Sequence, residues 1–103
     1  MTPIYYIGLM SGTSLDGIDA VLVNFGEPKP VLLATLFYPY DEELRANLLA
    51  LHHAGFDELN RAAVLSNQLS ILYAQTSLNL LKKSKIDPKA VTAIGCHGQT
   101  IRH

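Results

Sequence analysis

The sequence predicts an α/β fold with a mixed sheet. Three apolar segments, residues 4–10, 18–23 and 29–40, are rich in β-branched and aromatic side chains and are joined by short connections, as in an antiparallel meander. A helical stretch without any charge between residues 62 and 81 follows, and then a short apolar segment at residues 90–96. A strand that comes after a long helix favours a parallel addition to the sheet.

A loop of small and polar residues joins the first two predicted strands and is a candidate ligand site. Gly12 has no Cβ, so the backbone can approach a ligand closely, and consecutive amides in such a turn form a concave nest for phosphate oxygens. The hydroxyls of Thr13 and Ser14 add donors without adding bulk. Asp16 and Asp19 are suited to outer-sphere contacts with Mg²⁺. These residue types therefore favour an anion site.

The same loop is also compatible with a plain β-hairpin. Asp16-Gly17 is a strong turn signal, and Asp-Gly turns between strands are common. The loop lacks the Gly-Lys-Ser/Thr ending of a phosphate-binding Walker A motif, and it does not match the dinucleotide-binding glycine pattern. Residue chemistry alone leaves the anion site and the plain hairpin open.

Two helices are predicted between the third and fourth strands. Asp41 is the expected N-cap of the first helix, which has acidic residues in its first turn, runs to about residue 53 and is stopped by Gly55. Asp57 is the expected N-cap of the second helix, which covers residues 58–84.

The second helix carries apolar side chains on two sides. A second line of apolar residues, Val64, Ile71 and Leu78, lies on the other side of the helix from its main apolar stripe. Polar residues interrupt the apolar sequence of this helix and exclude a membrane span. This side therefore needs a partner, either the rest of a larger protein or a second copy of the chain. The main stripe has helical spacing and consists of Ala62, Leu65, Leu69, Leu72, Tyr73, Thr76 and Leu80.

Composition narrows the function classes. The charged fraction is 17%, below the roughly 25% of an average domain, and the net charge of −1 gives no electrostatic case for nucleic acid or an anionic membrane. Cys96 is the only cysteine, so no intramolecular disulfide forms, and we expect it to be a small buried apolar residue.

Two adjacent histidines near the end of the first predicted helix do not make a metal site. His52 and His53 point about 100° apart on a helix and cannot easily share one metal ion. No secretory signal pattern is present.

The segment that follows the fourth predicted strand is a second candidate site. Ligands in open α/β sheets gather beyond the carboxyl ends of strands. His97, Gln99 and Thr100 supply donors and acceptors there, and Gly98 permits close approach, as the recognition of sugar hydroxyls requires. A polar turn at the end of a strand, in which the histidine bonds only to local backbone, is the alternative.

Two motifs together resemble a known family. Residues 8–19 (GLMSGTSLDGID) and 96–100 (CHGQT) closely resemble the N-terminal part of the anhydro-N-acetylmuramic acid kinases, bacterial enzymes of the actin/hexokinase/sugar-kinase ATPase superfamily. The resemblance extends over residues 5–103. It implies that residues 1–103 form the N-terminal part of the first, ribonuclease-H-like lobe, whereas periodicity alone supports only a mixed α/β sheet.

The resemblance also implies an activity. Enzymes of this family use ATP and Mg²⁺ to open the 1,6-anhydro ring of anhydro-N-acetylmuramic acid and to phosphorylate O6, which gives N-acetylmuramic acid 6-phosphate during cell-wall recycling in the cytoplasm. His97, Gln99 and Thr100 would face the anhydrosugar. Asp16 would face the water shell of the metal or brace the loop, and a structural role for Asp19 is equally compatible. The ATP phosphates would be held by Gly12, Thr13, Ser14, Leu15, Asp16, Gly17, Ile18 and Asp19.

The chain departs from the family in its length. It resembles less than a third of the enzyme, and neither the catalytic aspartate that activates the ring-opening water nor the adenosine-binding motif is present. We therefore expect a fragment without kinase activity of its own. Two alternatives are a non-catalytic module that forms a homodimer through the second side of the long helix, and an actin-like or chaperone-like ATPase lobe. The sugar-side segment, residues 97–100, argues against the ATPase lobe.

Overall fold

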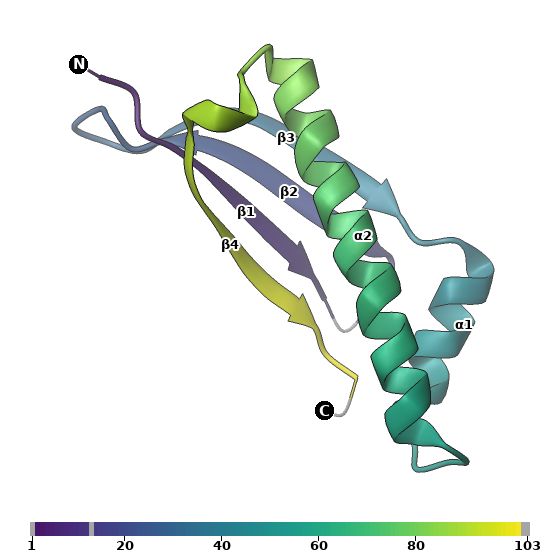
Figure 1. Cartoon of the computed structure of the whole chain (residues 1–103). Helices are drawn as coiled ribbons and strands as arrows, with labels where there is room; N and C mark the ends of the chain where they lie inside the picture. The colour runs from purple at the N-terminus through teal and green to yellow at the C-terminus, as the bar shows by residue number, and fades with distance from the viewer. Residues whose placement is uncertain (1, 13, 102–103) are drawn as a thin grey trace.

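One four-stranded sheet forms the centre of the computed structural model, which describes residues 2–12 and 14–101. The strand order is β3-β2-β1-β4, with β1 antiparallel to β2, β2 antiparallel to β3, and β4 parallel to β1 (Figure 1). This arrangement confirms the predicted meander and the parallel fourth strand. The strands are β1 (Tyr5–Ser11), β2 (Gly17–Asn24), β3 (Val31–Pro39) and β4 (Val91–Gln99).

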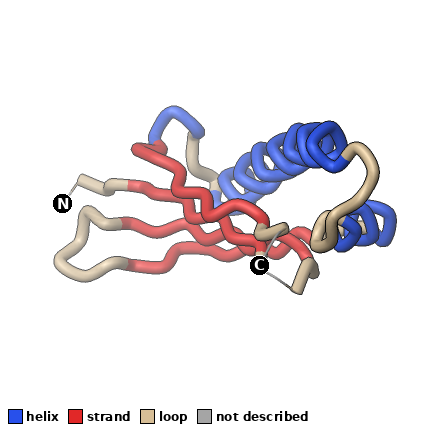
Figure 2. The backbone as a smooth tube through the Cα atoms, turned by 90° about the horizontal axis from the view of Figure 1, so that it is seen from below, coloured by secondary structure: helices blue, strands red, loops and turns tan. Residues whose placement is uncertain are grey.

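Both α-helices lie on the same side of the sheet (Figure 2). Helix α2 (Glu58–Ser84) crosses β2 and β3, and helix α1 (Glu42–Ala50) packs beside it, near the end of the sheet. A short 3₁₀ turn, η1 (Pro88–Ala90), leads into β4. No helix of the described residues is both long enough and apolar enough to cross a membrane. The main stripe of α2 and the inward side chains of the strands form the core, which includes Ile7, Leu15, Ile18, Leu22, Leu48 and Leu80.

The beginnings of both helices agree with the prediction, but one cap differs in chemistry. Asp41 Oδ1 accepts a hydrogen bond from the Leu44 amide at 2.7 Å, which confirms Asp41 as an N-cap. Asp57 occupies the position before α2, but its φ of 53° is left-handed and its side chain does not cap the helix. Its carboxylate instead accepts a hydrogen bond from Asn60 Nδ2 at 3.1 Å.

Helix α1 ends earlier than predicted, at Ala50 instead of about residue 53. The amides of Leu51 and His52 bond to the carbonyls three residues before them, so the helix tightens and stops before Gly55 is reached. His52 Nδ1 lies 3.2 Å from the Leu48 carbonyl oxygen, which agrees with a polar residue at a helix end. Leu51 is buried in the core at this point.

Strand β4 is longer and more exposed than predicted. It extends to Gln99, so His97 and Gln99 belong to the strand and do not follow it. Residues 92–97 are exposed, and Cys96 is an exposed thiol, so the expectation that Cys96 is a small buried apolar residue is wrong. The reason is that α2 packs over β2 and β3, whereas β4 is the margin of the sheet.

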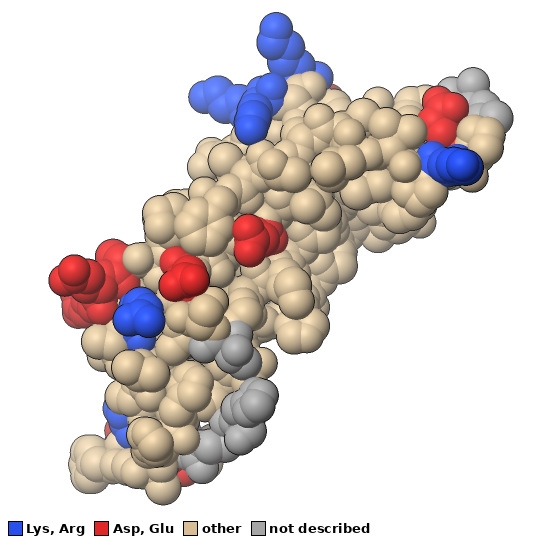
Figure 3. All heavy atoms as spheres, turned by 180° about the vertical axis from the view of Figure 1, so that it is seen from behind, with Lys and Arg blue, Asp and Glu red and all other residues tan. Residues whose placement is uncertain are grey.

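The second side of α2 is uncovered, as its pattern predicts. Val64, Ile71 and Leu78 are 50%, 59% and 56% exposed. The opposite face of the sheet is also largely uncharged, as Figure 3 shows from behind. Met10 and Phe37 are large exposed apolar side chains on that face.

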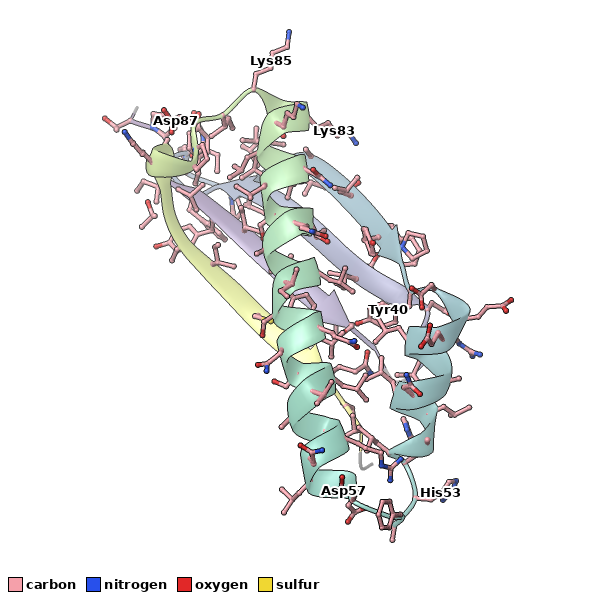
Figure 4. All side chains as sticks on the ribbon, turned by 45° about the vertical axis from the view of Figure 1, so that its right-hand side comes forward. Tyr40, His53, Asp57, Lys83, Lys85 and Asp87 are labelled. Carbon is pink, nitrogen blue, oxygen red and sulfur yellow. The ribbon has the colours of Figure 1, made fainter. Side chains whose placement is uncertain are left out.

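The start of β2 lies close against the end of β3, at Gly17 and at a hydrogen bond to Asp16. A Cβ on Gly17 would lie 2.2 Å from the Tyr38 carbonyl oxygen and 2.9 Å from Pro39 Cα, so only glycine allows this approach. The amide of Tyr40 donates to the Asp16 carbonyl at 3.0 Å. The Tyr40 ring is buried between α1 and α2 (Figure 4). The pKa of Tyr40 is raised to about 12, and this burial is the largest cause of the increase.

We predict that Gly17→Ala destabilises the chain by about 2–4 kcal/mol, because the added methyl group meets backbone atoms that cannot move aside. Urea unfolding of the 103-residue chain measures the change. Gly95→Ala is the matched control in the same sheet, since a Cβ there meets no atom within 4 Å. Equal stability of the two variants would contradict the close approach at Gly17.

We predict that Tyr40 makes folding stability fall as the pH rises from about 10 to 12. The unfolded state loses the phenolic proton near the ordinary pKa of about 10, whereas the folded state keeps it up to about 12. The stabilisation that the buried, protonated Tyr40 contributes is therefore fully present below pH 10 and is lost as the pH rises through the folded-state pKa of about 12. The difference in unfolding free energy between wild type and Tyr40→Phe, measured by urea at pH 9 and pH 11, should shrink at the higher pH. A constant difference would contradict the burial effect.

Candidate functional site

The loop between β1 and β2 turns at Leu15, not at the predicted Asp16-Gly17 pair. The Leu15 amide donates to the Gly12 carbonyl at 3.2 Å, and Leu15 has a left-handed φ of 58°. This unusual backbone directs the Leu15 side chain into the core, where it is 1% exposed. Burial of a leucine offsets the cost of the left-handed conformation and holds the middle of the loop against the protein.

The loop has an outer and an inner set of residues. Gly12, Ser14 and Asp16 are exposed, so a ligand can reach them. Leu15, Gly17 and Ile18 are buried, so these residues can meet a ligand only through their backbone. Thr13, which the sequence assigns to the same phosphate site, lies outside the described residues.

The space over Gly12 is open. A Cβ there would meet only Ser14 Oγ, at 3.9 Å. Packing within the described chain therefore does not require a glycine at this position, in contrast to Gly17. Glycine at position 12 would let a ligand approach the backbone closely, and the open space leaves room for such a ligand.

The two candidate acidic residues lie in different surroundings. The Asp16 carboxylate is exposed and makes no hydrogen bond or ion pair with the described residues, while its backbone oxygen accepts from Tyr40. Asp19 lies on the open face of the sheet, paired with Met10 and Phe37 in neighbouring strands.

A metal site made by protein ligands alone does not occur in the part of the chain that the structure describes, since no three His, Cys, Asp or Glu residues cluster there. Mg²⁺ bound to a nucleotide needs no such cluster, because phosphate oxygens and waters fill most of its coordination. One exposed carboxylate, that of Asp16, is enough for a contact with the water shell of such an ion.

The structure brings only part of the second candidate segment to the loop. Gln99 turns toward it and donates from Nε2 to the Gly12 carbonyl at 2.9 Å. His97 is exposed, and its Nδ1 lies 3.3 Å from the carbonyl of its neighbour Gly98. Thr100 is half-buried, and its carbonyl accepts a second hydrogen bond from Gln99 Nε2 at 3.0 Å.

A buried group of hydroxyls supports this junction. Ser11 Oγ lies 2.5 Å from the Tyr73 hydroxyl and donates to the Gly98 carbonyl at 3.3 Å. The Tyr40 hydroxyl donates to Gln99 Oε1 at 3.3 Å. The end of β1, the connection before α1, the middle of α2 and the end of β4 therefore meet in one polar network.

Sequence reasoning does not identify Ser11, Tyr40 and Tyr73 as site residues. Alternation in β1 places Ser11 on the same inward face as Ile7 and Leu9, and a serine at an inward position is the available signal. Tyr73 belongs to the apolar stripe of α2, where its hydroxyl needs a partner once buried. Nothing in the sequence shows that these hydroxyls meet Gln99.

A hollow of about 330 Å³ opens beside Gln99, between the two helices and the end of β4. Its walls include Leu51, Leu69 and Ile101, and Gln99 and Tyr73 lie at its polar side. These largely apolar walls suit apolar groups better than a ring of sugar hydroxyls.

Comparison with known proteins agrees with the two motifs. The family model described as "Anhydro-N-acetylmuramic acid kinase" matches residues 4–103. Curated proteins of that name are similar to the chain: one from Nitrosomonas europaea is 65% identical over 99 residues, covering 96% of this chain and 27% of the relative. Another from Nitrosospira multiformis is 59% identical over 103 residues, covering all of this chain and 28% of the relative.

A more distant relative shows the same coverage. The protein of that name from Neisseria meningitidis serogroup C is 52% identical over 99 residues, covering 95% of this chain and 27% of the relative. The chain thus spans little more than a quarter of the length of the curated relatives it matches. Because the family model covers nearly every residue, including the loop after β1 and the end of β4, the chain belongs to the anhydro-N-acetylmuramic acid kinase family.

Proposed function

We propose that the chain is the phosphate-binding part of an ATP-dependent kinase that opens the 1,6-anhydro ring of anhydro-N-acetylmuramic acid and phosphorylates O6. The product is N-acetylmuramic acid 6-phosphate, and the process is cell-wall recycling in the cytoplasm. The observation that carries this proposal is the family match over residues 4–103. Family membership also favours a kinase over an actin-like or chaperone-like ATPase.

The exposed half of the loop is suited to the nucleotide. Phosphoryl transfer depends mainly on positioning and on neutralising charge, and both tasks suit backbone amides and hydroxyls. Gly12 permits close approach of the phosphates, and the exposed Ser14 hydroxyl adds a donor. ATP and Mg²⁺ are the proposed cofactors, with Asp16 facing the water shell of the ion.

The sugar side is proposed at the end of β4. The exposed His97 and the half-buried Thr100 lie at the carboxyl end of a strand parallel to β1, so both candidate segments lie at the same end of the sheet. The parallel pairing of β1 with β4 supports a proposal in which the phosphate donor and the sugar acceptor bind near one another. The base that activates the ring-opening water is assigned to no residue of this chain.

We predict that the purified 103-residue chain forms no phosphorylated sugar from anhydro-N-acetylmuramic acid and Mg-ATP. A longer protein that contains these residues should convert the same sugar to its 6-phosphate. Mass spectrometry of the products measures both reactions, with plain N-acetylmuramic acid as the competing sugar. A longer protein that hydrolyses ATP without forming the sugar phosphate would contradict the proposed function.

A second role, self-association into a homodimer, is favoured by the exposed line on α2. Val64, Ile71 and Leu78 are at least half exposed and recur along one side of the helix. We predict that the chain dimerises at micromolar concentration in light scattering and that Ile71→Glu shifts it to the monomer. Leu59→Glu, at an exposed apolar residue that is not on this line, is the control. A monomeric wild-type chain would contradict the dimer.

A further inference from the structure

The Gln99 side chain has no donor left for a ligand. A glutamine amide has two N–H donors, and those of Gln99 are directed to the carbonyls of Gly12 and Thr100, at 2.9 Å and 3.0 Å. Its Oε1 accepts from the Tyr40 hydroxyl at 3.3 Å. A sugar hydroxyl could bind the amide nitrogen only by displacing one of these backbone carbonyls.

Two carbonyls of the phosphate loop are held from outside the loop. Gly12 O accepts from Gln99 Nε2 and also from the Leu15 amide, so it has two donors. Asp16 O accepts from the backbone amide of Tyr40 at 3.0 Å. Since the Tyr40 hydroxyl in turn bonds to Gln99, both carbonyls are held by one connected pair of residues.

The orientation of these carbonyls matters for an anion. A carbonyl oxygen carries partial negative charge and repels phosphate oxygens, whereas amides attract them. A site that holds its dipoles in place before the ligand arrives avoids the cost of reorienting them on binding. Hydrogen bonds that keep the Gly12 carbonyl turned toward β4 therefore favour nucleotide binding without any contact to the nucleotide.

We propose that Gln99 is a positioning residue for the phosphate loop, acting through the Gly12 carbonyl with Tyr40 as its support, and does not donate a hydrogen bond to the sugar. This inference rests on the proposed function of the loop and revises the role expected for Gln99 from the sequence. It also gives the two candidate segments a physical connection, because Gln99 lies between His97 and Thr100 on the proposed sugar side.

The kinetic test uses the longer protein that contains these residues, with Gln99→Met, which keeps the volume and removes the hydrogen bonds. We expect the dissociation constant for Mg-ATP, measured by calorimetry without sugar, to rise about tenfold, and Tyr40→Phe to raise it about threefold. The KM for the anhydrosugar at saturating Mg-ATP should stay within about twofold. Gln75→Met, on an exposed glutamine of α2, is the matched control and should change neither value. A higher sugar KM with unchanged ATP affinity would overturn the proposal.

A second measurement needs no nucleotide or sugar. Hydrogen exchange of the Leu15 amide, which bonds to the Gly12 carbonyl, should be about fivefold faster in Gln99→Met and unchanged in Gln75→Met. Unchanged exchange in Gln99→Met overturns the positioning role even in an active kinase. Faster exchange in a protein that does not phosphorylate the anhydrosugar upholds the positioning role and rejects the proposed function, so the two failures are distinct.

Discussion

The parallel pairing of β1 with β4 places Ser11 opposite Gln99, and the candidate site depends on this register. The two strands are separated by 79 residues of the chain, and α2 makes their alignment possible. A helix of 27 residues is about 40 Å long, enough to return the chain along the sheet so that β4 starts beside the first residue of β1. A shift of one residue in this pairing would turn Gln99 away from Gly12.

The polar network at the junction is fully satisfied. None of the buried side-chain nitrogen or oxygen atoms of the described residues lacks a partner. Buried polar groups cost free energy when one partner is missing, so a complete network is compatible with stability and also selects one arrangement. Ser11 and Tyr73 join the strand to the long helix, and Tyr40 and Gln99 join the network to the loop.

The uncovered surfaces have a common physical meaning. The second line of α2 is apolar and exposed, and β4 is an exposed edge strand with one unpaired side. Proteins usually cover both kinds of surface. An apolar groove lined by Leu78, Ile94 and Cys96 lies between these two elements. The low charged fraction of 17% agrees with a chain that packs against further protein. The relatives, of which it spans little more than a quarter, have additional chain that could supply such a covering.

Local sequence patterns determined most of the elements. Apolar segments, three of them rich in β-branched and aromatic residues, predicted the four strands. The Asp41 cap and the span of α2 were correct, and the two motifs identified the family. These features depend on propensities and spacings within a few residues, which a sequence displays directly. The exposed second line of α2 was predictable for the same reason.

Tertiary structure decided the turn at Leu15, the end of α1, the exposure of β4 and the direction of the Gln99 side chain. The turn at Leu15, the exposure of β4 and the direction of Gln99 depend on partners far away in the chain, as when Gln99 meets Gly12 across 87 residues. A glutamine beside a strand end can face a ligand or the protein, and the sequence is the same in both cases. Only the register of β4 against β1, with Tyr40 and Thr100 close enough to take up its remaining hydrogen bonds, turns it inward.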